Sequence, residues 1–175
     1  CRGVQTPGGC GALRIGAELI RRARPEARVW VSTPTWANHI PLIGGAGLQL
    51  LEYPYYDGAR RTIDFDAMMG TLAGVGAGDL VLLHGCCHNP TGADLDRDQW
   101  RAITELALKN GFTPFVDTAY QGLGDGIDED VEGLRLLCAA VPECIVATSC
   151  SKNFGLYRER AGAVFFIAGD SAAAD

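Results

Sequence analysis

The feature that most constrains the fold of this 175-residue chain is the alternation of short apolar runs with helical patterns. Brief runs rich in Val, Ile, Leu and Phe are typical of strands buried on both faces of a sheet. Such runs cover residues 29–31, 80–84, 112–117, 144–148 and 164–167, with a weaker one at 48–53. The spacing of apolar residues predicts helices over residues 12–24, 38–45, 66–72, 96–110 and 130–140. Strands alternating with helices predict an α/β fold whose sheet is covered on both faces.

The clearest helix is predicted over residues 96–110. Trp100, Ile103 and Ala107 share one of its faces, and Gly111 is placed to end it. We find no internal repeat or linker, and we interpret residues 74–78 as a loop inside the domain. The length suffices for one domain with a substantial core.

Composition and charge exclude several classes of function. The net charge is -6 and the sequence pI is about 5.0, which argues against a nucleic-acid partner. No apolar run approaches the roughly 18 residues that a membrane span needs. The seven cysteines form no CxxC pair, so we expect no metal site and free thiols in a reducing cytoplasm. The chain begins at Cys1 and has no signal segment, and we expect residues 1–175 to be an internal piece of a longer protein.

Polar residues gather where the predicted strands end, which is where ligands bind in sheets of this kind. They lie at residues 84–89, at Asp117 and at residues 149–152. Of the two lysines, Lys109 is placed as a solvated charge near a helix C-terminus. Lys152 follows an apolar strand, where a lysine loses its proton more readily, as Schiff-base chemistry demands. Taken alone, Lys152 also fits a structural role.

A phosphate site is suggested by two separate stretches. Ser149, Ser151 and Arg160 bracket the lysine, and Arg can grip a phosphate through two hydrogen bonds. Upstream, PGGCG at residues 7–11 runs into a predicted helix, so backbone N–H groups could point at an anion. This stretch is neither GxGxxG, since Arg14 occupies the third glycine position, nor GxxxxGK[ST], which counts against a nucleotide-binding module.

Asp117 ends a predicted strand and has two interpretations. It can cap a turn, or its carboxylate can face a pyridinium nitrogen and keep the ring protonated. Tyr120, three residues on, could donate its phenol to a ring oxygen. His39 could orient Asp117, although a lone histidine is more often structural.

Five stretches carry a family resemblance. QTPGGCGALR, TPTWANH, HGCCHNPTG, DTAYQG and SCSKNFGLYRERAG begin at Gln5, Thr33, His84, Asp117 and Ser149. Together they resemble the class I aspartate and aromatic aminotransferases, in order and over nearly the whole chain. The resemblance implies the pyridoxal phosphate (PLP)-dependent transferase fold type I, with three α/β/α layers and a mostly parallel sheet. Residues 1–175 would be part of the large cofactor-binding domain of a homodimeric enzyme, without its N-terminal arm and C-terminal small domain.

The resemblance also implies roles for single residues. Lys152 matches the lysine that binds PLP as an imine and shuttles a proton on the substrate carbon. Asp117 matches the partner of the pyridine nitrogen, and His39 the histidine behind it. Tyr120 and Asn89 match groups that bind the ring oxygen, and Asn89 also contacts the substrate carboxylate.

The remaining matches concern the ring face and the phosphate. Trp36 matches the aromatic side chain that stacks on the ring and helps to bind substrate, although a plain core role would also suit it. The phosphate cradle is matched by Gly9, Cys10, Ser149, Ser151 and Arg160. The family usually has Thr or Ser in place of Cys10, and a thiol is a weaker donor than a hydroxyl. Cys86 and Cys87 belong to the motif, and we interpret them as packing residues.

The implied activity is exchange of an amino group between an amino acid, aspartate or aromatic, and a 2-oxo acid such as 2-oxoglutarate. Two alternatives stay open, a PLP lyase or decarboxylase and a non-catalytic PLP-binding fragment. In the family, the arginines that bind the substrate carboxylates lie downstream of the last residue here. The sequence therefore does not choose between aspartate and aromatic substrates, and we expect residues 1–175 alone not to transaminate at a useful rate.

Overall fold

A seven-stranded sheet forms the centre of the molecule in the computed structural model, which describes residues 1–170. The strand order is β1-β9-β8-β7-β6-β2-β3. Strands β2, β3, β6, β7 and β8 run parallel, while β9 pairs antiparallel with β8 and β1 antiparallel with β9. The strands span Arg2–Pro7 (β1), Arg28–Thr33 (β2), Gln49–Pro54 (β3), Leu80–His84 (β6), Thr113–Thr118 (β7), Cys144–Ser149 (β8) and Ala161–Ile167 (β9). The predicted α/β fold with a mostly parallel sheet is confirmed.

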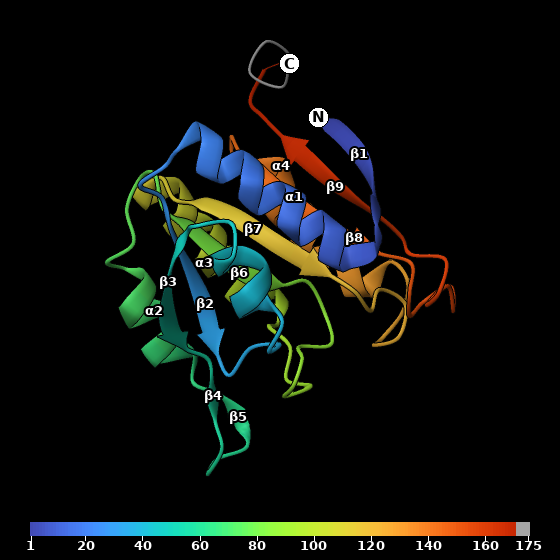
Figure 1. Cartoon of the computed structure of the whole chain (residues 1–175). Coiled ribbons are helices and arrows are strands. Elements are labelled where there is room, and N and C mark those ends of the chain that lie inside the picture. Colours follow the sequence, from blue (N-terminus) through green and yellow to red (C-terminus); the bar gives the residue numbers. More distant parts are fainter. Residues whose placement is uncertain (171–175) are drawn as a thin grey trace.

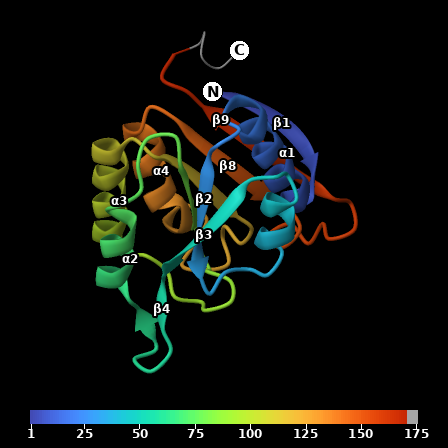
Figure 2. The ribbon, with the colours of Figure 1, turned by 60° about the vertical axis from the view of Figure 1, so that its left-hand side comes forward.

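Helices cover both faces of this sheet (Figures 1 and 2). Helix α1 (Gly8–Ala23) and the short π-helix η1 (Ile40–Gly44) lie on one face. Helices α2 (Phe65–Leu72), α3 (Arg97–Asn110) and α4 (Glu132–Ala140) lie on the other. The arrangement has three layers, and no helix within residues 1–170 is long and apolar enough to cross a membrane.

The two cores follow from the alternation of side chains along each strand. In β6, Leu80 and Leu82 pack under α1, while Val81 and Leu83 pack under α2 and α3. All four side chains are essentially excluded from solvent, and burying each one contributes about 1.5–3 kcal/mol. This continuous apolar run is why the sequence predicts β6 with the bounds that the structure has.

Helix α3 has well-defined signals at both ends. The Asp96 carboxylate accepts a hydrogen bond from the Gln99 N–H at 2.8 Å, and the Gln99 side chain accepts one from the Asp96 N–H at 2.9 Å. This reciprocal pair is a capping box. Gly111 ends the helix in the left-handed conformation with φ 78°. The expected bounds and the predicted end at Gly111 are confirmed.

Several elements differ from the sequence expectation. Helix α1 begins at Gly8 rather than at residue 12, and the edge strand β1 precedes it. Strand β1 escapes prediction because only Thr6 in it is buried, so it shows no apolar run. A small hairpin, β4 (Tyr56–Asp57) and β5 (Thr62–Ile63), is also unpredicted. Its tight turn is held by the Asp57 carboxylate, which accepts from the backbone N–H groups of Ala59 and Arg60.

The last helix starts later than expected. A 3-10 turn, η2 (Glu129–Val131), occupies the start of the predicted segment, and α4 follows at Glu132. Asp130 does not cap α4. Its carboxylate accepts hydrogen bonds from the N–H groups of Gly122, Gly124, Asp125 and Gly126, so it organises the preceding loop.

Candidate active site

A cavity of about 230 Å³ opens at the carboxyl ends of the parallel strands β6, β7 and β8. This is the edge at which open α/β sheets bind ligands. Every residue assigned above to cofactor binding lines it: Gly9, Cys10, Trp36, Asn89, Asp117, Tyr120, Ser149, Ser151, Lys152 and Arg160. Segments far apart in the sequence therefore converge on one space, as the resemblance implies.

One wall of the cavity is the start of helix α1. Its first turn carries no acidic residue and no side-chain cap, so its N–H groups are available to an anion. A Cβ on Gly9 would lie 3.1 Å from Cβ of Ser149. Gly8 has φ +73°, and a Cβ there would collide with the Arg160 guanidinium. The two glycines thus allow the start of α1 to lie close to Ser149 and Arg160.

Arg160 is fixed over this wall. Its Nη1 donates to Ser151 Oγ at 3.2 Å and to the Tyr157 carbonyl oxygen at 3.0 Å. Nη2 approaches the carbonyl oxygen of Pro7 at 3.5 Å. The Ser151 N–H donates to Ser149 Oγ at 3.2 Å, which orders the serines. A guanidinium, two hydroxyls and a helix N-terminus together suit a doubly charged oxyanion.

Lys152 reaches into the same cavity from the turn after β8. Its Nζ lies 5.4 Å from the centre of the Tyr120 ring and 4.9 Å from that of Tyr157. Both distances suit cation–π attraction. Among residues 1–170, no carboxylate forms an ion pair with Lys152, so its amine is not held by an opposite charge.

Asp117 stands at the end of a directed hydrogen-bond chain. The Asn89 N–H donates to Nδ1 of His84 at 3.4 Å, which places the His84 proton on Nε2. That proton faces Thr35 Oγ1 at 3.2 Å, and the Thr35 hydroxyl then donates to His39 Nδ1 at 2.8 Å. His39 consequently donates from Nε2 to Asp117 Oδ2 at 3.0 Å. Each donor in the chain points toward Asp117, so the last hydrogen bond holds its carboxylate at the end of β7.

The environment of His84 supports this assignment. Burial lowers the pKa of His84 well below its ordinary value, and nearby His88 and His39 lower it further, so His84 is neutral. The ring of His88 lies 4.0 Å from that of His84 and stacks on Tyr55, also at 4.0 Å. Burial lowers the pKa of His88 to about 4. All three histidines of the chain thus lie in one connected cluster.

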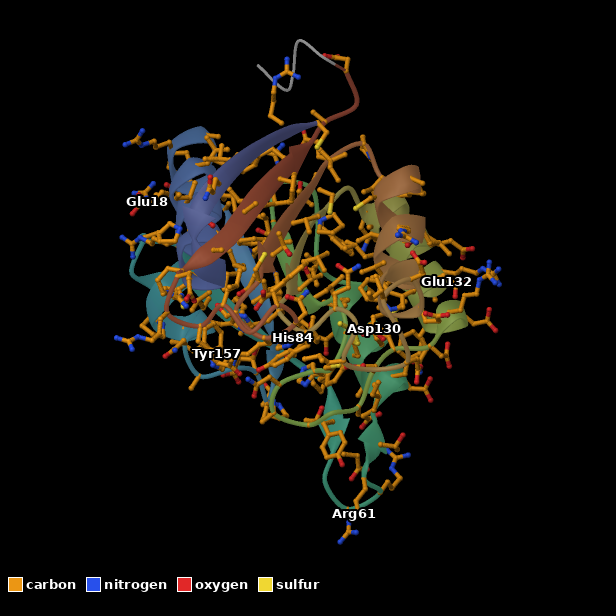
Figure 3. The ribbon with its side chains drawn as sticks, turned by 90° about the vertical axis from the view of Figure 1, so that its right-hand side faces the viewer. Glu18, Arg61, His84, Asp130, Glu132 and Tyr157 are labelled. Atoms are coloured by element: carbon orange, nitrogen blue, oxygen red, sulfur yellow. The ribbon has the colours of Figure 1, made fainter. Side chains whose placement is uncertain are left out.

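The structure adds residues that sequence reasoning missed. His84, Cys86 and Tyr157 also line the cavity, and Figure 3 shows His84 and Tyr157 near the same end of the sheet. Cys86, interpreted above as packing alone, is buried but also forms part of the cavity wall. Its place two residues after the end of β6 was the available signal. Thr35 carried none, because its partner His84 lies 49 residues away.

Fold and cavity together define an α/β protein with a pocket that suits an oxyanion and contains a carboxylate near the end of β7 and a lysine in the turn after β8. A sequence profile described as aminotransferase class I and II matches residues 1–173. The aromatic-amino-acid aminotransferase of Paracoccus denitrificans is 50% identical over 97% of this chain and 43% of its own length. The aspartate aminotransferase of Escherichia coli K12 is 50% identical over 99% of this chain and 44% of its own length.

Solved structures agree in fold. An aromatic-amino-acid aminotransferase from Burkholderia pseudomallei, described as covalently bound to pyridoxal phosphate, superposes with a TM-score of 0.96 at 43% identity, covering 98% of this chain and 43% of that one. A mitochondrial aspartate aminotransferase from Trypanosoma brucei gives 0.94 at 38% identity, covering 98% and 46%. The chain belongs to the class I and II aminotransferase family. It spans less than half the length of these relatives.

Proposed function

We propose that the complete protein is a PLP-dependent aminotransferase that exchanges an amino group between aspartate or an aromatic amino acid and a 2-oxo acid such as 2-oxoglutarate. One observation carries the proposal: the Lys152 amine, the Asp117 carboxylate and the residues of the phosphate cradle all line one cavity. The names of the relatives, which include aspartate, aromatic and tyrosine aminotransferases, support the substrate class.

The residues present fit PLP. Its phosphate suits the cradle, where a Cβ on Gly9 would lie only 3.1 Å from Cβ of Ser149 and Arg160 supplies the countercharge. Cys10 stands in the first turn of α1 and offers a thiol as well as its N–H. The ring would then lie toward Asp117 and Trp36, with Asn89 and Tyr120 beside it.

Bound PLP would supply a carbon that amines attack and a ring that withdraws electrons from the substrate carbon. Lys152 would hold it covalently through Nζ and, once displaced by substrate, would carry a proton to and from the substrate carbon. Asp117 would keep the ring nitrogen protonated, and His39 would hold the carboxylate in place through its hydrogen bond to Oδ2. The contact from Asn89 Nδ2 to the Tyr120 hydroxyl, 3.4 Å, would place both side chains at the ring oxygen.

Partners and location are part of the same proposal. We infer that the complete enzyme is a cytoplasmic homodimer that binds neither nucleic acid nor membranes. The net charge of -6 supports the absence of a nucleic-acid partner. Sedimentation of the full-length protein and fractionation of its source cells test these two points.

The activity is tested by incubating the full-length protein and PLP with aspartate, phenylalanine or tyrosine and 2-oxoglutarate. We expect stoichiometric glutamate and the matching 2-oxo acid. Release of carbon dioxide or ammonia without glutamate would instead identify a decarboxylase or lyase. Lys152→Ala should abolish turnover, whereas Lys109→Ala, on the last turn of α3, should retain it.

A further inference from the structure

Two cysteines lie together away from the cavity. Cys138 is in the last turn of α4, and Cys144 begins β8, at the opposite end of that strand from Ser149. Their sulfur atoms are hydrogen-bonded at 3.8 Å. Only residues 141–143 separate α4 from β8, so the two sulfurs are held near each other by a short, ordered connection.

We propose that Cys138 and Cys144 form a reversible oxidation site, in which a peroxide oxidises Cys138 and Cys144 resolves the product as a disulfide. The attacking cysteine must be accessible and the resolving cysteine shielded, and the two positions differ in exposure in this way. Cys138 is partly exposed, whereas Cys144 is only 1% exposed. A buried thiol next to a reactive one meets the oxidised sulfur before solvent does.

The hydrogen bond also supports this order of reaction. In the neutral pair the Cys138 thiol donates to Cys144 Sγ, whose own proton faces the Ile145 carbonyl oxygen at 3.7 Å. When Cys138 is ionised, Cys144 can donate to it instead. This donation lowers the pKa of Cys138, against the opposite effect of burial, while the same pairing raises the pKa of Cys144. Thiolates, not thiols, attack peroxide.

The reaction balances in two steps. The Cys138 thiolate attacks one peroxide oxygen, the O–O bond breaks, and sulfenic acid and hydroxide result. Cys144 then attacks the Cys138 sulfur, its proton leaves with the sulfenic oxygen as water, and an S–S bond forms. The sulfurs must close from 3.8 Å to about 2.05 Å. Side-chain rotation at the end of a helix can supply a movement of this size.

Other cysteines make useful comparisons. Cys86 and Cys87 are adjacent in sequence, and burial raises the pKa of both thiols, so neither is favoured as the attacking thiolate. Cys150 shares the stretch between Arg135 and Lys152 with the proposed pair and is also partly exposed. It is therefore the competitor that an experiment must separate from Cys144.

The test treats the full-length protein with hydrogen peroxide, blocks free thiols, and digests it without reductant after Arg135, Glu143 and Lys152. These cuts release LLCAAVPE, which contains Cys138, and CIVATSCSK, which contains Cys144 and Cys150. We expect the two fragments to remain joined until a reductant is added. Unlinked fragments, with Cys138 unmodified or irreversibly oxidised, would overturn the proposal.

Variants assign the second sulfur. Cys150→Ser should keep the crosslink, and Cys144→Ser should abolish it and let Cys138 proceed to sulfinic acid. A crosslink that disappears in Cys150→Ser would overturn the proposal. Because Cys144 is buried and its replacement could unfold the domain, Cys138→Ser serves as a second variant, which should leave Cys144 unoxidised at the same peroxide dose.

Discussion

The hydrogen-bond chain that ends at Asp117 can be broken at Thr35 with almost no change of shape. In Thr35→Val a methyl group replaces the hydroxyl, so His84 Nε2–H loses its acceptor and His39 Nδ1 loses its donor. His39 is fully buried, whereas Thr35 and His84 are half-buried, so the loss falls mainly on His39 Nδ1. A buried polar group left without a partner costs about 1–3 kcal/mol, so we expect a loss of about that size.

The assay is equilibrium urea unfolding of wild type, Thr35→Val and Thr35→Ser. The serine variant keeps the hydroxyl and loses only a methyl group, so its free energy of unfolding should stay within about 1.5 kcal/mol of wild type. Nitrogen-15 spectra of the histidine rings should place the proton of His39 on Nε2 in wild type. If Thr35→Val were as stable as Thr35→Ser, the hydroxyl would not join the two histidines and the directed chain would be refuted.

Three further predictions concern helix ends, pH and the cofactor. Asp96→Ala removes the capping box of α3 and should cost about 1 kcal/mol in urea unfolding, whereas exposed Asp98→Ala should cost less than about 0.5 kcal/mol. His88 titrates near 6.5 when unfolded and near 4 when folded, so its contribution is complete above pH 6.5 and is lost as pH falls toward 4. That loss amounts to roughly 3 kcal/mol. It is measured by following the free energy of unfolding between pH 7 and pH 4, and a fall with pH in His88→Gln as large as in wild type would contradict it. Cys10→Thr, which gives the cradle a stronger donor, should tighten PLP binding by about 0.5–1.5 kcal/mol in a titration, and looser binding would show that the site suits sulfur.

The parts of the fold that the sequence predicts are those with local signals. Strand β6 is a run of buried apolar residues, and α3 has a capping residue at Asp96 and a terminating glycine at Gly111. Strand β1 and the β4–β5 hairpin lack such signals, because β1 is exposed at the sheet edge and the hairpin strands have two residues each. Their pairing depends on distant partners, such as β9 for β1, which no local pattern encodes.

The residues of the candidate site also fall into those that local sequence predicts and those that it does not. Lys152, Asp117 and the glycines before α1 are recognisable from residue type and from their place at element ends. The hydrogen bonds from Thr35 to His39 and His84 depend on where the fold places the segment after β2 relative to the end of β6. The Tyr157 ring approaches Lys152 only through the path of the loop after it. Such contacts arise only in the folded chain, so local sequence patterns do not predict them.

The central claim is that Lys152 is the residue to which the cofactor attaches. The most direct measurement is reduction of the PLP-loaded full-length protein with borohydride, followed by digestion and mass spectrometry. The only other lysine in this chain, Lys109, lies on the surface at the end of α3 and serves as an internal control. We predict the pyridoxyl group on Lys152 and an unmodified Lys109. A pyridoxyl group on Lys109, or on neither lysine, would contradict the assignment.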